Sequence, residues 1–89
     1  MSVSEIGAIM YDERKVDEAV LALLHLNAFK DRYGWRAWKG LDWGALDRLH
    51  ERGLIGDPKS KAKSVQLTDE GVALAEELFQ HHFGIVTES

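Results

Sequence analysis

This 89-residue chain has four histidines, the side chains best suited to metal binding or proton transfer. His81 and His82 are adjacent, so on a helix they point about 100° apart and are poorly placed to share one ion. His25 and His50 are isolated in the sequence, and no His-x-x-x-His or Glu-x-x-His spacing occurs. We therefore predict no metal site.

Other catalytic arrangements are also missing. The chain has no cysteine, which excludes thiolate catalysis, disulfides and zinc fingers. The candidate carboxylate pair, Glu76-Glu77, is more simply explained as the solvated face of a helix, and no glycine-rich phosphate loop is present. We expect a protein that is not an enzyme and that holds no cofactor.

Basic residues offer a different chemistry, the binding of phosphate groups. The net charge of −4 argues against a surface that embraces nucleic acid on all sides. The charge is nevertheless segregated, because residues 30–39 carry four basic residues against one acid and residues 59–63 carry three lysines. The candidate nucleic-acid contacts are Arg36, Lys39, Arg48, Lys59, Lys61 and Lys63.

The three lysines are spaced by two residues, so in an extended hairpin Lys59, Lys61 and Lys63 project to one side. Such a row of cations suits a phosphate backbone and does not read base sequence. The alternative is a charged edge that keeps strands of other chains from pairing with it.

Three tryptophans, Trp35, Trp38 and Trp43, alternate with Arg36 and Lys39. This mixture suits single-stranded nucleic acid, whose bases stack on aromatic rings, and it also suits a protein interface. A third explanation is that the rings fill internal space and arginine packs on a ring face. We take Trp35 and Trp38 as candidate protein contacts.

The elements that position these residues begin with a core helix at 13–28, capped by Asp12 and apolar on most sides. The segment 30–41 predicts a short strand or an irregular turn. A second helix, capped by Asp42, ends before Gly53, which supplies a left-handed position.

In this second helix the apolar residues Trp43, Leu46 and Leu49 are expected to face inward. Its outward positions are Gly44, Ala45, Asp47, Arg48, Glu51 and Arg52. This face pairs two arginines with two acids and has no amide or hydroxyl, so it is poorly suited to reading base edges.

The last part of the chain predicts a turn at Asp57-Pro58, a strand at 64–67, and a helix at 69–83 capped by Thr68. The expected buried stripe of this helix is Val72, Ala75, Leu78, Phe79, His82 and Phe83.

Two patterns carry a resemblance to known families. Leu46-x-x-Leu49-x-x-x-Gly53-Leu54-Ile55, followed by Leu67-Thr68-x-x-Gly71, resembles winged-helix regulators of the MarR and PadR type. That resemblance implies a recognition helix at 42–52, a wing at 56–64 and a helix at 69–83 that often contributes to a dimer.

The whole chain resembles an uncharacterised bacterial family of short domains of unknown function. The match lies in the segments 16–24, 36–43 and 61–65 and in the Leu-Thr pair that follows them. It implies a compact winged-helix-like fold and brings no activity with it.

We predict one α+β winged-helix-like domain over residues 1–89, with an N-terminal arm or short helix at 1–11 and a tail at 84–89. The function is either a DNA-binding regulator or a protein-interaction module without DNA binding. A homodimer is expected through apolar residues near both ends, namely Ile6, Ile9, Met10, Phe79, Phe83, Ile85 and Val86. No membrane span or signal peptide is apparent, and we expect a cytoplasmic protein.

Overall fold

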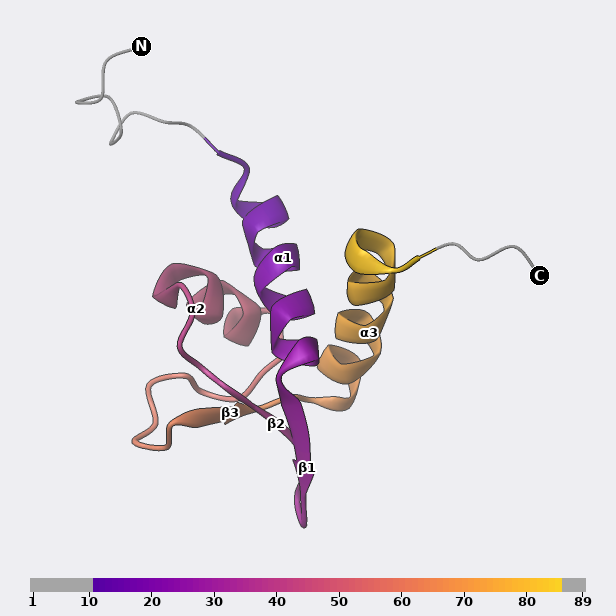
Figure 1. The fold of residues 1–89 in the computed structure, drawn as a ribbon. Coiled ribbons are helices and arrows are strands. Elements are labelled where there is room, and N and C mark those ends of the chain that lie inside the picture. The colour runs from indigo at the N-terminus through magenta and orange to yellow at the C-terminus, as the bar shows by residue number, and fades with distance from the viewer. Residues whose placement is uncertain (1–10, 86–89) are drawn as a thin grey trace.

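The computed structural model of the chain describes residues 11–85, which form three helices and a small sheet (Figure 1). The elements are α1 (Glu13–Leu26), β1 (Ala28–Asp31), β2 (Gly34–Trp38), α2 (Trp43–Glu51), β3 (Ser64–Gln66) and α3 (Asp69–Phe83). The strands are antiparallel in the order β1-β2-β3, and an isolated bridge pairs Ile55 with Leu67. The prediction of a small α+β domain is confirmed, and the arrangement is consistent with a winged-helix-like fold. Within the described part of the chain, no helix is long and apolar enough to cross a membrane.

Aspartates cap the first two helices, as predicted. The Asp12 carboxylate accepts a hydrogen bond of 2.9 Å from the Arg14 N–H, and the Asp42 carboxylate accepts one of 3.0 Å from the Ala45 N–H. Each carboxylate satisfies a backbone donor that has no partner inside its helix.

The prediction that the core helix reaches residue 28 is wrong, because α1 ends at Leu26 and Ala28 already belongs to β1. The side chain of Asn27 donates to the Leu23 carbonyl at 3.2 Å and so satisfies one of the last carbonyls of the helix. Beyond this point the chain turns into a strand that had no sequence signal of its own.

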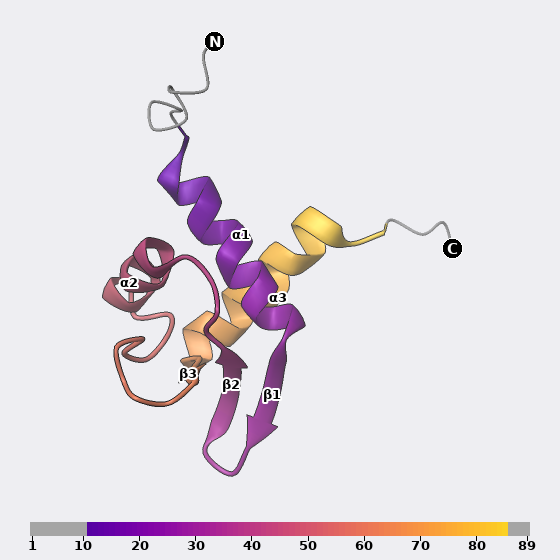
Figure 2. The same cartoon turned by 60° about the vertical axis from the view of Figure 1, so that its left-hand side comes forward.

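The segment 30–41 contributes most of a β-hairpin, which projects away from the three helices (Figure 2). Asp31 pairs with Gly34, so Arg32 and Tyr33 form a two-residue loop. The Asp31 carboxylate accepts from the Tyr33 N–H at 2.8 Å, and Gly34 has φ 132°, a conformation that favours glycine. The sequence predicted either a short strand or an irregular turn for this segment, and the strand is present as β2.

The residues of the Gly-Leu-Ile and Leu-Thr pattern meet where α2 ends and α3 begins. Gly53 has φ 75°, and its carbonyl accepts a hydrogen bond of 2.7 Å from the Thr68 hydroxyl. The Thr68 N–H donates to the Leu54 carbonyl at 3.1 Å, while its hydroxyl oxygen accepts from the Gly71 N–H at 3.0 Å. The residues of this pattern therefore form one tertiary contact between the end of α2 and the beginning of α3. The predicted cap at Thr68 is confirmed.

The core lies between the helices and one face of the sheet. Its largest fully buried side chains are Leu21, Leu24, Leu46, Leu49, Ile55, Val65 and Pro58. The expected orientation of α2 is wrong at two positions, because Trp43 is 54% exposed and Ala45 is completely buried. A helix that packs between neighbours at close range favours the small side chain at the contact and leaves the large one at its solvent-exposed beginning.

The predicted stripe on α3 is buried only near the start of the helix. Ala75 is fully buried, Leu78 and Phe79 are half-buried, and His82 and Phe83 are exposed. The expectation that the last two are buried is wrong for the described chain, and an apolar surface remains at the end of α3.

Candidate functional site

The sequence predicted a wing at residues 56–64. Residues 56–63 of this segment form the loop between Ile55 and β3, which we call the wing, and Ser64 already belongs to β3. The wing begins with the predicted turn, in which the Asp57 carboxylate accepts from the Lys59 N–H at 2.8 Å. The loop continues as turns and bends up to Ser64. The expectation of an extended hairpin with three lysines projecting to one side is therefore wrong, since alternation requires a strand. The side chains of Lys59, Lys61 and Lys63 are nevertheless exposed, and none forms an ion pair within the described residues.

Lys39 fastens this loop to the sheet. Its ammonium group donates to the carbonyls of Pro58 and Ser60 at 2.7 and 2.6 Å, and lies 5.9 Å from the centroid of the Trp43 ring. The Lys39 N–H also donates to the Lys63 carbonyl at 3.2 Å. Lys39 thus uses two of its three side-chain donors within the protein, and its geometry is that of a residue that positions the loop.

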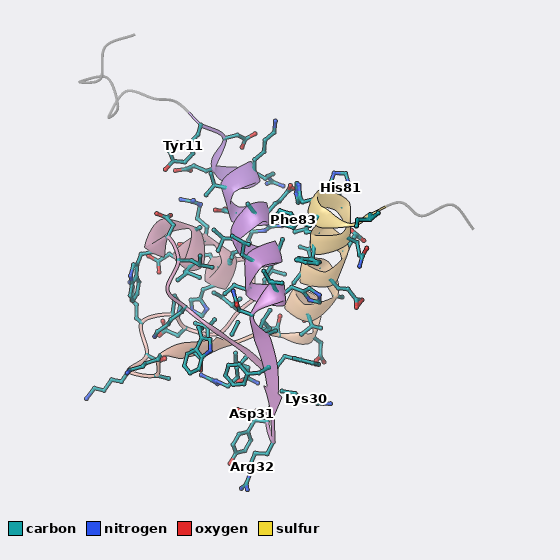
Figure 3. The ribbon with its side chains drawn as sticks, viewed as in Figure 1. Tyr11, Lys30, Asp31, Arg32, His81 and Phe83 are labelled. Carbon is teal, nitrogen blue, oxygen red and sulfur yellow. The ribbon has the colours of Figure 1, made fainter. Side chains whose placement is uncertain are left out.

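Arg36 joins the same two regions from β2. Its Nε donates to the Ser64 hydroxyl at 2.8 Å and its Nη2 to the Ser64 carbonyl at 2.9 Å. The two basic segments of the sequence, 30–39 and 59–63, are therefore brought together along β2 and β3. Lys30 and Arg32 lie further away, at the free end of the hairpin (Figure 3).

Arg48 has a different environment from the other candidate cations. Its guanidinium forms a two-pronged interaction with the buried Asp17 carboxylate, with nitrogen–oxygen distances of 2.7 to 3.0 Å, and also reaches Glu13 at 3.4 Å. The hydrogen bonds to Asp17 raise the pKa of Arg48, so it stays charged. The pair ties α1 to α2.

Beside this ion pair is an open groove of about 840 Å³. Acidic and basic side chains line it in similar numbers, namely Tyr11, Asp12, Glu13, Arg14, Asp17, Arg48, Glu51 and Arg52. A lining of mixed sign does not favour phosphate groups.

The three tryptophans do not form one cluster. Trp35 and Ala37 lie on the sheet face that packs against α1 and α3, and Trp35 helps to line an apolar cavity of about 180 Å³. Trp38 projects from the opposite face, and Trp43 begins α2. The ring of Phe29 contacts Trp38, with centroids 5.4 Å apart. The sequence reasoning missed Phe29, because its neighbours Ala28, Lys30 and Asp31 give no strand signal that could have found it.

The apolar residues expected at a dimer interface fall into two groups. Ile6, Ile9, Met10 and Val86 lie outside the described residues. Phe79 and Phe83 contact each other along α3 with tilted rings and centroids 5.3 Å apart, and His25 of α1 extends this row at 5.1 Å from Phe79. Ile85 follows directly and is 86% exposed.

The histidines lie on different parts of the fold. The Nδ1 of His50 is 3.1 Å from the Ile55 carbonyl, and the Nε2 of His82 is 3.6 Å from the Glu18 carboxylate. Among residues 11–85 no group of three or more histidine, aspartate and glutamate side chains is placed to hold a metal ion.

The fold defines a small α+β domain with three helices and a three-stranded antiparallel sheet. A family model described as a domain of unknown function, DUF6429, matches residues 12–85, and the chain belongs to this family. A relative from Sinorhizobium fredii (strain NBRC 101917 / NGR234), the uncharacterized protein y4hR, is 58% identical over 72 residues. The match covers 81% of this chain and 93% of the relative. No solved structure gives a significant match.

Proposed function

We propose that this protein is a non-enzymatic binding module of the winged-helix regulator type, which contacts DNA phosphates through the wing lysines Lys59, Lys61 and Lys63. One observation carries the proposal: the wing, although it is an irregular loop, is fixed to the sheet by Lys39. A fixed loop holds its exposed cations in one place, so less conformational entropy is lost when phosphates bind them.

The distribution of charge supports the same surface. The helix α3 carries four acidic residues and no lysine or arginine, whereas the charged residues of β2 and the wing are mostly basic. The acidic helix would repel DNA and the basic surface would attract it, so the module would bind in one orientation. The Arg48–Asp17 pair leaves α2 with little capacity to read bases, and we expect weak dependence on sequence.

The test is fluorescence anisotropy of a labelled DNA duplex at about 50 and 200 mM salt. The variant with Lys59, Lys61 and Lys63 replaced by alanine should bind more weakly, and its salt slope should fall by about 0.9 for each phosphate that it no longer neutralises. The matched control replaces Arg14, Lys15 and Arg52, three exposed cations of the helical side, and has the same net charge. Equal weakening in both variants, or no lysine-dependent binding, would refute the proposal.

A second candidate function is a homodimer whose interface includes the exposed end of α3. The observation that favours it is the aromatic row formed by His25, Phe79 and Phe83, together with Ile85, because apolar surface of this kind is a common feature of interfaces. Such a module would act through protein contacts without binding DNA directly.

Analytical ultracentrifugation of the full chain at micromolar concentration tests the dimer. Phe83→Ser should shift the population to monomer, whereas Tyr33→Ser, at the free end of the hairpin, should not. A wild-type protein that sediments only as monomer would show that the dimer proposal is wrong.

A further inference from the structure

One face of the sheet carries two exposed aromatic side chains side by side, whereas Trp35, which is 39% exposed, is the one exposed aromatic ring that the strands place on the other face. Ala28 pairs with Ala37 and Lys30 with Trp35, and these side chains lie on the face toward α1 and α3. The pairing places Phe29, Arg36 and Trp38 on the opposite face. There Phe29 is 36% exposed and Trp38 is 57% exposed, although both are large apolar side chains.

The two rings on this face form a compact aromatic surface. Their planes are tilted by 39° at a centroid separation of 5.4 Å, so each ring stabilises the orientation of the other. Both rings stand on adjacent hydrogen-bonded strands, which is a more rigid support than a loop. A planar ligand can therefore stack here without a rearrangement of the backbone.

Cations lie at both ends of this aromatic surface. Trp38 pairs directly with Ser64, and Ser64 follows Lys63 of the wing. At the other end the hairpin loop carries Arg32, whose side chain extends from the free tip (Figure 3). A ligand that crosses the aromatic surface along the hairpin would thus meet positive charge before and after it, which complements a chain of phosphates with planar bases between them.

We infer that the face formed by Phe29 and Trp38 binds a segment of single-stranded DNA, whose bases stack on the rings while the wing lysines contact its phosphates. This inference rests on the proposed function and specifies that the bound DNA is single-stranded. A duplex hides its ring faces inside the stack, whereas a single strand exposes them.

The surface gives RNA no contact that DNA lacks, because its hydrogen-bonding side chains are engaged within the protein. Arg36 bonds to Ser64, and the Gln66 side chain donates to the Tyr33 carbonyl at 3.4 Å. Selection of RNA over DNA would require free groups that bond to the 2′-hydroxyl, so we do not expect RNA to bind more tightly than DNA.

The test uses two full-length variants that differ in which tryptophan remains. In one, Trp35 and Trp43 are replaced by phenylalanine, so that Trp38 is the sole tryptophan fluorophore. In the other, Trp38→Phe leaves Trp35 and Trp43. Addition of an oligothymidylate of about ten nucleotides, a length typical of one small site, should quench the first variant strongly and the second weakly.

Affinity is measured in parallel by anisotropy with the labelled oligothymidylate, a duplex and an oligouridylate. Trp38→Ala should weaken the single-stranded complex by roughly tenfold or more, in line with the removal of one stacking partner, and Trp38→Phe should recover most of the affinity. Trp35→Ala, on the other face of the same strand, should change the affinity less than about twofold, with circular dichroism confirming that each variant is folded.

Three results would overturn the inference. Tighter binding to the duplex than to the single strand, with lysine dependence, would retain the proposed function and refute the single-stranded site. Preference for oligouridylate would refute the assignment to DNA. Absence of binding to every nucleic acid, with a change in sedimentation on Trp38→Ala, would refute both proposals and identify the face as a protein interface.

Discussion

Gly71→Ala tests the close approach that joins α2 to α3. A Cβ atom at this position would overlap the carbonyl oxygen of Leu54 and lie 2.9 Å from its carbonyl carbon. Both are backbone atoms, and the Leu54 carbonyl is held in place by the Thr68 N–H at 3.1 Å. Neither atom can move aside as a flexible side chain would, so one of the two helix ends must shift.

The size of the effect follows from three contributions. Overpacking of a close contact costs about 1–3 kcal/mol, and disruption of the Thr68–Leu54 hydrogen bond adds about 1 kcal/mol. Alanine is a better helix former than glycine by up to about 1 kcal/mol, which offsets part of this cost. We expect a net destabilisation of about 1–3 kcal/mol, which is a large share of the stability of a small domain.

Urea unfolding followed by circular dichroism at 222 nm measures this change. With a typical slope of about 1–3 kcal/mol per molar urea, the midpoint should fall by about 1 M. Gly40→Ala is the control, because a Cβ there would meet no atom within 4 Å. A Gly71→Ala variant within about 0.5 kcal/mol of wild type, the range of neutral surface substitutions, would refute the close approach of these two helix ends.

Three further substitutions test other parts of the fold in the same urea assay. Thr68→Ala removes the cap of α3 and should destabilise the protein by about 1–2 kcal/mol, whereas Thr68→Ser should retain most of the stability; equal effects would contradict the capping role. Leu46→Ala leaves a cavity in the core and should cost about 2–5 kcal/mol, and a destabilisation below about 1 kcal/mol would contradict its full burial. Arg48→Met leaves the buried Asp17 carboxylate without its partner and should lower the midpoint, while adding Asp17→Leu should recover much of the stability; a double variant as unstable as the single one would contradict this explanation.

The helix ends could be predicted because they depend on short-range chemistry. Asp12, Asp42 and Thr68 each cap a helix through a hydrogen bond to a residue two or three positions later. Gly53 adopts the left-handed conformation that its place after a helix predicted. Such signals lie within one turn of the chain and do not require knowledge of the tertiary structure.

The strand β1 could not be predicted in the same way. Residues 28–31, Ala-Phe-Lys-Asp, have little strand propensity and become a strand because they pair with β2, whose register only the fold defines. The helical spacing of Trp43 predicts a buried side chain, yet Trp43 is 54% exposed. Spacing alone does not determine which neighbours surround a side chain in the first turn of a helix.

The candidate site was predicted in its residue types and not in its geometry. The sequence predicts that Lys39 and Arg36 contact phosphates, but in the structure their donors bond mainly to the wing and to Ser64. Those partners lie 19 to 28 positions away in the sequence, so only the structure brings them together. The contact between Phe29 and Trp38 could not be predicted for the same reason, because it connects the two strands of the hairpin.

Nuclear magnetic resonance of the ¹⁵N-labelled full chain, titrated with oligothymidylate, tests nucleic-acid binding on this surface most directly. The three tryptophan indole N–H groups give separate signals, and that of Trp38 should shift most, together with backbone amides of β2 and of residues 56–64. Signals of α3 should stay in place. No shifts at all, or shifts confined to α1 and α3, would contradict binding of nucleic acid by the sheet and the wing.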